Sequence, residues 1–152
     1  MSLPRIPDHL HAIGIIHSPY KKPSDVPWNK KDHISEIELN QQLASGLKDI
    51  EGFSHIHILY WLDQSKGYSL IVQPPWDTKP HGLFATRSPH RPNPIGYAVV
   101  ELIQRNDTLL QVKGLDAIEG TPVLDIKPFI AKSDCKHHAK SGWLDTVPSE
   151  RK

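Results

Sequence analysis

The sequence has few of the features that mark secreted or membrane proteins. It contains one cysteine, Cys135, in 152 residues, which excludes an internal disulfide and is compatible with a reducing compartment. No window approaches the roughly 18 apolar residues of a membrane span, and the N-terminus lacks the apolar core of a signal peptide. We therefore expect a soluble cytoplasmic protein with no membrane partner.

An excess of charge of one sign is also missing. The formal net charge is +1, from 18 Lys and Arg against 17 Asp and Glu. A chain with this balance has no overall positive field to attract nucleic acid, so any RNA contact must use a local basic patch.

Several catalytic and cofactor motifs are absent as well. Without GxGxxG or a βαβ alternation, a Rossmann site is excluded, so a nucleotide-like cofactor would have to bind in another way. There is no GxSxG motif, and Ser88, which stands before Pro89, has no identifiable base, so serine hydrolysis is disfavoured.

Ten histidines raise the question of a metal site. His9 and His11, and again His55 and His57, have the i, i+2 spacing that places two imidazoles on one face of a strand. A further group of potential ligands stands near the C-terminus: Asp134, Cys135, His137 and His138. Zinc needs three or four ligands, and neither a third ligand at a suitable spacing nor a CxxC or HExxH motif is present. We predict no metal site; a metal-dependent barrel enzyme built on the histidine pairs is the less favoured alternative.

The composition that is present favours strands and turns. There are 14 prolines and nine glycines, and the chain is long enough for one domain with a proper core. Apolar alternation predicts strands near residues 11–17, 35–39, 53–62, 68–73, 97–103, 109–115 and 123–126. A helix is expected from about Asn40, with Leu43, Leu47 and Ile50 on one face. The sequence predicts an all-β fold: a small barrel-like sheet, closed or partly open, of about seven strands with one helix. Residues 1–10 are expected to form a loose arm, 11–132 the barrel, and 133–152 a polar tail anchored by Trp143.

One stretch, residues 84–96 (FATRSPHRPNPIG), is crowded with proline. Pro89, Pro92 and Pro94 each fix their own φ and drive the preceding residue toward extended backbone, which excludes a helix and makes a central strand unfavourable. Strand-like runs flank it, at 83–86 and 97–103. The sequence therefore predicts a stiff, extended loop that carries arginine, histidine and asparagine side chains. A binding site on such a loop is favoured over a plain connector.

Two shorter sequence patterns fit the recognition of a ligand. Asp116, Glu119 and Asp125 surround Gly120-Thr121-Pro122, which suits recognition of a hydroxyl pair such as a ribose, although a turn with solvated acids fits equally well. Asn93 is held rigid by Pro94, and an amide in that state can accept from an amino group while donating to a ring nitrogen, as in adenine recognition. Asn-Pro is also a common way to begin a turn.

The 84–96 stretch resembles the signature of the TrmO family (also called YaeB-like or TsaA-like), methyltransferases that act on threonylcarbamoyladenosine in tRNA. Residues 13–20, 49–55 and 115–128 resemble the family's other blocks, in the family's order. Together the four blocks cover most of residues 11–130.

The resemblance implies a barrel-like fold and transfer of a methyl group from S-adenosyl-L-methionine to N6 of threonylcarbamoyladenosine, on the 3′ side of the tRNA anticodon. It implies a homodimer too, for which the apolar run 53–62 and the open edges of a small sheet are further reasons. The implied cofactor-binding residues are Pro27, Trp28, Asn29, Asp63, Gln64, Arg87, Asp116, Ala117, Ile118 and Glu119. His90 and Arg91 are implied to bind the RNA, with Asn93 as the catalytic residue.

The chain departs from the family pattern at several points. The family usually has Pro-Arg-Gln where this chain has Pro27-Trp28-Asn29, an arginine at His17 and a histidine at Asp63. The chain ends at residue 152 without the C-terminal domain of longer members, which leaves open a different set of tRNAs or another small substrate. A non-catalytic RNA- or nucleotide-binding barrel is the second alternative function.

Overall fold

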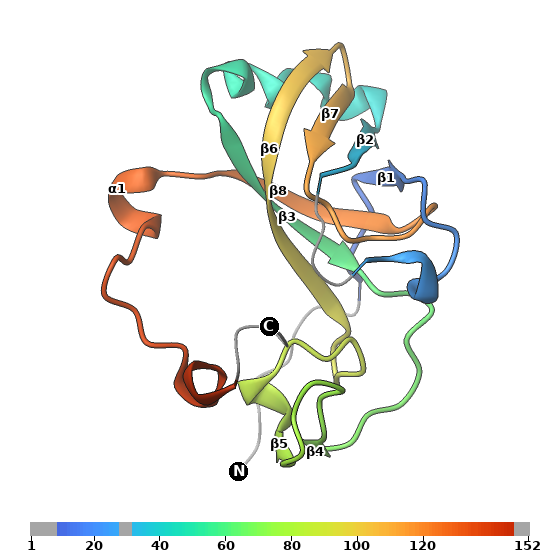
Figure 1. Cartoon of the computed structure of the whole chain (residues 1–152). Coiled ribbons are helices and arrows are strands. Elements are labelled where there is room, and N and C mark those ends of the chain that lie inside the picture. The colour runs from blue at the N-terminus through green and yellow to red at the C-terminus, as the bar shows by residue number, and fades with distance from the viewer. Residues whose placement is uncertain (1–8, 28–31, 148–152) are drawn as a thin grey trace.

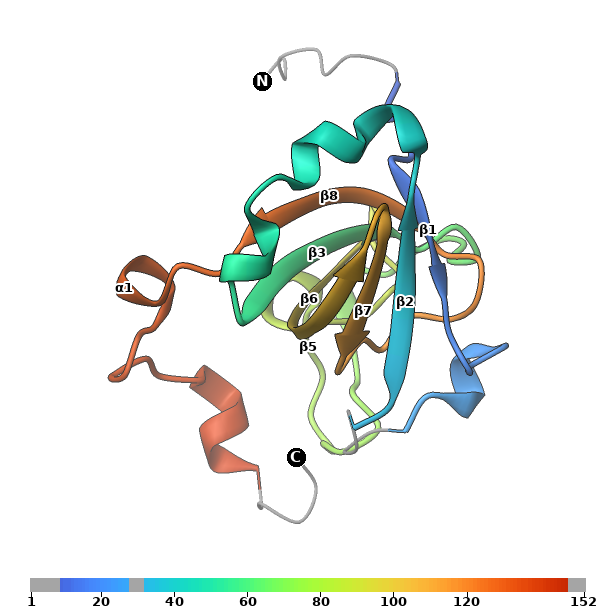
Figure 2. The same ribbon diagram turned by 90° about the horizontal axis from the view of Figure 1, so that it is seen from above.

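The computed structural model describes residues 9–27 and 32–147, and its centre is a closed six-stranded β-barrel. The barrel strands are β1 (Gly14–His17), β2 (Ile34–Leu39), β3 (His55–Trp61), β6 (Ile95–Asn106), β7 (Leu109–Lys113) and β8 (Pro122–Pro128). They are joined in the order β1-β2-β7-β6-β3-β8, and every neighbouring pair is antiparallel. The predicted all-β, barrel-like fold is confirmed (Figures 1 and 2).

The barrel interior is filled by every second residue of these strands. In β3, Ile56 and Ile58 are fully buried and Tyr60 nearly so, while the residues between them are more exposed, as the alternation predicts. β-branched and leucine side chains from the other strands complete the core: Ile16, Ile37, Val100, Leu110, Val112 and Val123. At about 25 cal/mol per Å² of apolar area removed from water, such burial is the main stabilising contribution to the barrel.

The expected helix after Asn40 is present but is a 3₁₀-helix, η2 (Gln41–Leu47), not an α-helix. The Asn40 side chain accepts from the backbone N–H of Gln42 at 3.0 Å, which is the expected cap. Leu47 is its only buried residue and joins the barrel core, so η2 lies over one end of the barrel (Figure 1). A second short turn, η3 (Ile50–Gly52), follows and leads into β3.

Three strand predictions need correction. The strand expected at 11–17 begins only at Gly14, and that expected at 68–73 shrinks to β4 (Ile71–Val72), which pairs with β5 (His81–Gly82) in a separate two-stranded sheet. The prolines that follow Gln73 have no backbone N–H to continue the ladder. The strand-like run 83–86 is the 3₁₀ turn η4 (Leu83–Ala85), which the Thr86 hydroxyl closes by donating to the Leu83 carbonyl at 2.8 Å. The described residues therefore form eight strands, six of them in the barrel.

Barrel closure also corrects one argument for a dimer. Each of the six strands has a partner on both sides, so the barrel offers no open edge that a second subunit would need to cover.

The C-terminal segment leaves the barrel after β8 and returns to the small sheet. It contains α1 (Ala131–Asp134) and η5 (Gly142–Thr146), and Figure 1 shows it passing outside the barrel from one to the other. Trp143 stacks on His81, with ring centroids 3.9 Å apart, and its Nε1–H donates to the Ala85 carbonyl at 2.9 Å. These contacts attach η5 beside η4.

None of the described helices has the length and apolar character that a membrane crossing needs.

Candidate functional site

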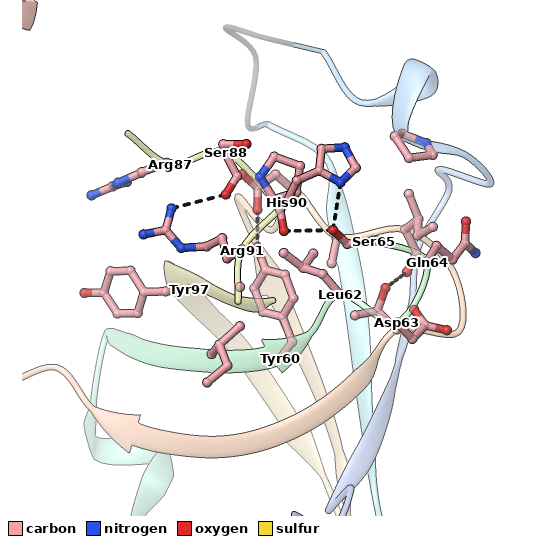
Figure 3. Close-up of a pocket in the computed structure, with 18 of the residues that line it drawn as sticks. Tyr60, Leu62, Asp63, Gln64, Ser65, Arg87, Ser88, His90, Arg91 and Tyr97 are labelled. Atoms are coloured by element: carbon pink, nitrogen blue, oxygen red, sulfur yellow. Dashed lines mark hydrogen bonds between the residues drawn. The ribbon is translucent and has the colours of Figure 1, made fainter. Parts of the chain in front are cut away.

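A cleft of about 580 Å³ lies between the C-terminal end of β3, the proline-rich loop and the turn after β7. Its volume lies within the roughly 300–1,000 Å³ range of small-molecule sites. Figure 3 shows Asp63 and Gln64 at one end and Arg87, Arg91 and Tyr97 at the other. A ligand that contacts both Arg87 and the Asp63-Gln64 pair must therefore span the cleft.

The floor of the cleft is organised by Tyr60, the last buried residue of β3. Its hydroxyl donates to Oδ1 of Asp116 at 2.7 Å. Burial, followed by the negative charge of Asp116, raises the pKa of Tyr60 far above its usual range, and Arg87 only partly offsets this. The phenol therefore remains a donor at physiological pH and fixes the orientation of the Asp116 carboxylate.

Gly96 makes room for that tyrosine. It pairs directly with Tyr60 across the β3–β6 ladder, and a Cβ at this position would overlap the Tyr60 ring. The close approach explains why the proline-rich loop must end in glycine where β6 begins.

The proline-rich loop is held in shape by Arg91. Its Nη1 donates to the carbonyls of Thr86, Ser88 and Leu83 at 3.0, 3.3 and 3.4 Å, and its guanidinium lies over the Phe84 ring at 5.7 Å. The prolines remove backbone donors from the loop, so the carbonyls of Thr86 and Ser88 accept from this side chain, while the Leu83 carbonyl also accepts from the backbone N–H and the hydroxyl of Thr86. The loop bends at Thr86, at Pro89 and again at Pro92 and Asn93, and is not extended throughout as predicted.

Ser65 ties the other side of the loop to the end of β3. Its hydroxyl donates to the Pro89 carbonyl at 2.9 Å and lies 3.0 Å from Nδ1 of His90. Because a hydroxyl has one hydrogen, the His90 contact needs Nδ1–H as the donor, which defines the tautomer of that ring. His90 thereby lies at the cleft with Nε2 as the atom that is not protonated in the neutral ring.

The carboxylate of Glu119 is held by residues at the end of β1. Its carboxylate accepts from the Ser18 backbone N–H at 2.7 Å and from Nδ1 of His17 at 3.2 Å. The Ser18 hydrogen bond, then the His17 contact, hold the pKa of Glu119 below its usual range. His17 also contacts Glu38 at 2.8 Å, and these two carboxylates raise the pKa of His17, Glu38 making the larger contribution.

Most of the expected site residues come together at the cleft. Those that line it are Asp63, Gln64, Arg87, His90, Arg91, Asp116, Ala117 and Ile118. Pro27, Glu119 and the exposed Asn93 do not line it, and Trp28 and Asn29 lie outside the described residues. The roles assigned to all of these residues stay predictions.

Among the cleft-lining residues that the sequence reasoning did not assign to the site are Tyr60, Ser65 and Tyr97. Tyr60 and Tyr97 were assigned only to strands. Their positions at the β3 end and directly after Gly96 were the available signal, because strand ends next to a rigid loop are where sites form.

Among residues 9–27 and 32–147, no group of three or more His, Cys, Asp or Glu side chains is arranged to hold a metal ion. His57 pairs with Asp134 at 2.9 Å, and His9 and His11 lie with ring centroids 6.0 Å apart.

The chemistry of the cleft matches a ligand with three parts. Apolar walls from Leu62, Ile95 and Ile118 suit a flat ring system, and carboxylates suit vicinal hydroxyls. The planar guanidinium of Arg87 suits a carboxylate of the ligand. An adenosine joined to an amino acid has all three parts.

Comparison with known proteins gives consistent matches. The family model for the tRNA-methyltransferase O N-terminal domain matches residues 15–135. A protein of Archaeoglobus fulgidus named "Probable S-adenosyl-L-methionine-binding protein" is 49% identical over 145 residues, covering 94% of this chain and 40% of that protein. The tRNA (adenine(37)-N6)-methyltransferase of Escherichia coli is 36% identical, over 90% of this chain and 64% of its own length. The crystal structure of TrmO from Pseudomonas aeruginosa superimposes with a TM-score of 0.78 at 31% identity, covering 94% of this chain and 65% of that one. The chain thus spans less than two thirds of the length of each of these three proteins.

Proposed function

This chain belongs to the tRNA-methyltransferase O family, and from that premise we propose that it is an S-adenosyl-L-methionine-dependent tRNA methyltransferase. The observation that carries the proposal is the cleft, which unites six of the ten residues expected to bind the cofactor. The relatives' names, a probable S-adenosyl-L-methionine-binding protein and a tRNA (adenine(37)-N6)-methyltransferase, support the same activity.

In this proposal each end of the cleft holds one part of the cofactor. Asp116, oriented by the Tyr60 hydroxyl, accepts from the ribose hydroxyls. Asp63 and Gln64 bind the cofactor at one end of the cleft, and Arg87 at the other end pairs with the amino-acid carboxylate. The bound cofactor supplies a methyl group on a sulfonium, which a nitrogen nucleophile takes in one in-line displacement.

We assign the finer substrate as N6 of threonylcarbamoyladenosine next to the tRNA anticodon. His90 and Arg91 line the cleft with Arg87 and would contact the RNA, while Asn93, exposed two residues after Arg91, would orient the adenine. Orientation of the two reactants can supply much of the rate, so the protein needs no covalent intermediate.

We also propose a cytoplasmic homodimer. The apolar segment that leads into β4 supports a subunit contact, because Tyr68, Leu70 and Ile71 are 55%, 60% and 61% exposed. Light scattering of the wild type and of Ile71→Lys tests the assembly. A wild-type monomer at micromolar concentration would contradict it.

The test of activity is transfer of labelled methyl from S-adenosyl-L-methionine into tRNA. Two matched tRNAs are compared, one carrying threonylcarbamoyladenosine and one unmodified transcript, followed by mass spectrometry of the nucleosides. We expect a mass gain of one methyl group on threonylcarbamoyladenosine and no label in the transcript. Cofactor binding is measured separately, by calorimetry with a chelator present. A non-catalytic binding module would bind the cofactor or tRNA in this measurement but would transfer no methyl group. No heat of binding at millimolar cofactor would refute the proposal.

A further inference from the structure

A chain of three side chains connects the C-terminal segment to the cleft. Nδ1 of His57 in β3 lies 2.9 Å from the hydroxyl of Tyr97 in β6, and its Nε2 lies 2.9 Å from Oδ2 of Asp134 in α1. The rings of His57 and Tyr97 stack with centroids 5.7 Å apart. Only Tyr97 of the three lines the cleft, at the end where Arg87 and Arg91 lie (Figure 3).

The hydrogen-bond partners determine which atoms of Asp134, His57 and Tyr97 carry protons. The His57 contact and the Ile130 backbone N–H hold the pKa of Asp134 below its usual range, so its carboxylate can only accept. His57 must then donate through Nε2–H. In the neutral ring Nδ1 is an acceptor, and the Tyr97 hydroxyl donates to it. The phenol thus has a base within hydrogen-bond reach, and a carboxylate orients that base, as in an activated nucleophile or proton acceptor.

A second tyrosine–histidine pair in the same protein shows what distinguishes this one. The Tyr20 hydroxyl lies 2.6 Å from Nδ1 of His33, whose Nε2 lies 2.6 Å from the Leu115 carbonyl. That carbonyl fixes the tautomer but has no charge to balance an imidazolium, and Tyr20 does not line the cleft. The Asp134 carboxylate provides that charge in the Tyr97 chain.

His57, in the middle of these contacts, is more shielded from solvent than Tyr97. The side chains of His57 and Asp134 are 16% and 29% exposed, and the Phe129 ring lies 5.4 Å from the His57 ring. Tyr97, by contrast, is 46% exposed at the cleft. A shielded base behind an accessible phenol is suited to moving a proton away from a bound substrate.

We propose that Tyr97 is a catalytic residue that takes the proton of the attacking nitrogen, with His57 and Asp134 as positioning residues; the proposal rests on the methyl transfer proposed above. As the nitrogen forms its bond to the methyl carbon, the sulfur–carbon bond breaks and its electron pair stays on sulfur. The nitrogen's proton moves to Tyr97 Oη while the phenol proton moves to Nδ1 of His57. Asp134 balances the resulting imidazolium, which returns its proton to solvent after the product leaves.

The first test needs neither cofactor nor RNA. N-acetylimidazole acetylates tyrosine when the phenol oxygen bonds to the acetyl carbon and imidazole departs, so a base that removes the phenol proton speeds the reaction. Mass spectrometry gives the rate at Tyr97 in the wild type, in His57→Asn and in the matched control His55→Asn. His55 lies on the same face of β3 and contacts Ser54 instead of Tyr97. We expect His57→Asn to slow acetylation at least about tenfold, a small part of what a general base contributes, and His55→Asn to leave it unchanged.

The second test measures the reaction itself. Tyr97→Phe keeps the ring but removes the hydroxyl, so kcat for methyl transfer should fall about 10² to 10⁴-fold while the cofactor Kd and the tRNA KM stay within about twofold. Asp134→Asn keeps a hydrogen-bonding side chain without the charge, and should lower kcat and Tyr97 acetylation together. It also serves as the comparison if His57→Asn does not fold.

The outcomes separate this inference from the proposed function. Equal acetylation rates in His57→Asn and His55→Asn overturn the activation of Tyr97, whatever the methyl transfer shows. If Tyr97 of the wild type acetylates rapidly but kcat is unchanged in Tyr97→Phe, the role of Tyr97 in the reaction is overturned. A wild type that acetylates rapidly but methylates neither tRNA overturns the proposed function and supports the activated phenol.

Discussion

The ring of Tyr60 in β3 lies directly against the backbone of Gly96 in β6, so that even one methyl group at position 96 would overlap it. This contact joins the barrel core to the cleft, because the same tyrosine donates to Asp116. A change at Gly96 therefore affects packing and the site together.

Gly96→Ala should destabilise the barrel by about 1–3 kcal/mol, the usual cost of forcing extra volume into a packed core. The Tyr60 ring must move, so its hydrogen bond to Asp116 lengthens and cofactor affinity falls as well. Denaturant unfolding and calorimetry measure the two effects. Gly46→Ala is the matched control, since a Cβ there meets no atom within 4 Å. If Gly96→Ala and Gly46→Ala unfold at the same denaturant concentration, the contact has no energetic role.

The sequence predicted the barrel strands well because burial on one face imposes a two-residue period. Ile56 and Ile58 alternate with polar or exposed neighbours, and this pattern alone locates β3. Closure of the barrel depends on β1 pairing with β8, more than one hundred residues later, and no local pattern encodes that pairing. The 3₁₀ turn at Leu83–Ala85 was missed because Thr86 closes it through its hydroxyl, and apolar periodicity does not report side-chain caps.

Only part of the candidate site could be predicted from the sequence. Arg87, Asp63 and Asp116 were implied by resemblance, and they do line one cleft. Tyr60 was missed although it stands near the end of β3, because a buried tyrosine in a strand looks like any core residue until its partner is known. Glu119 fits the turn pattern, yet its carboxylate contacts Ser18 and His17 and does not line the cleft.

His17 should make stability depend on pH. Its pKa is raised by Glu38 and Glu119, so its stabilising contribution is fully present below the unfolded pKa, about 6.5, and is lost as the pH rises through the folded pKa. The free energy of unfolding should therefore differ more between wild type and His17→Gln at about pH 5.5 than at about pH 8.5. The His17 side chain is 40% exposed, which keeps the effect under about 1 kcal/mol.

The matched control for this prediction is His17→Arg, whose guanidinium remains charged and can reach both carboxylates. Its stability relative to His17→Gln should be nearly the same at both pH values. A wild-type advantage that grows toward pH 8.5 would contradict the assignment.

Arg87 and Arg91 should differ in what their removal disturbs. Arg87→Ala should weaken cofactor binding by about 1.5–3 kcal/mol, the scale of a hydrogen bond to a charged group, without changing the melting temperature. Sequence reasoning alone predicts that Arg91→Ala affects only RNA binding. Because Arg91 donates to three carbonyls of the loop that carries Arg87, we now expect Arg91→Ala to weaken cofactor binding too, and to flatten the salt dependence of tRNA binding.

Calorimetry with the cofactor, and tRNA KM at several salt concentrations, test this pair. Arg105→Ala is a control for loss of an arginine outside the cleft, since Arg105 contacts Glu51 and the Leu47 carbonyl. An unchanged cofactor Kd in Arg91→Ala would show that the loop keeps its shape without those three hydrogen bonds.

Trp143 should determine whether the C-terminal segment stays attached. Trp143→Ala removes both the stacking on His81 and the hydrogen bond to Ala85, each worth about 0.5–1.5 kcal/mol, so local opening becomes at least about fivefold more populated. Trypsin should then cleave after Lys136 and Lys140 at least about fivefold faster, because slow cleavage follows the open population. The barrel should melt as in the wild type, since Trp143 does not belong to its core.

Trp143→Phe separates the two contributions to this attachment. The phenyl ring can still stack on His81, whose Nε2 is held 2.8 Å from Oδ2 of Asp77, but it cannot donate to the Ala85 carbonyl. Cleavage of this variant should therefore fall between those of the wild type and Trp143→Ala. Because Ala85 lies two residues before Arg87, loss of the indole donor should also weaken cofactor binding slightly, by less than tenfold. A Trp143→Ala protein that is cleaved at the wild-type rate would mean that other contacts, such as the buried Val147, hold the segment in place.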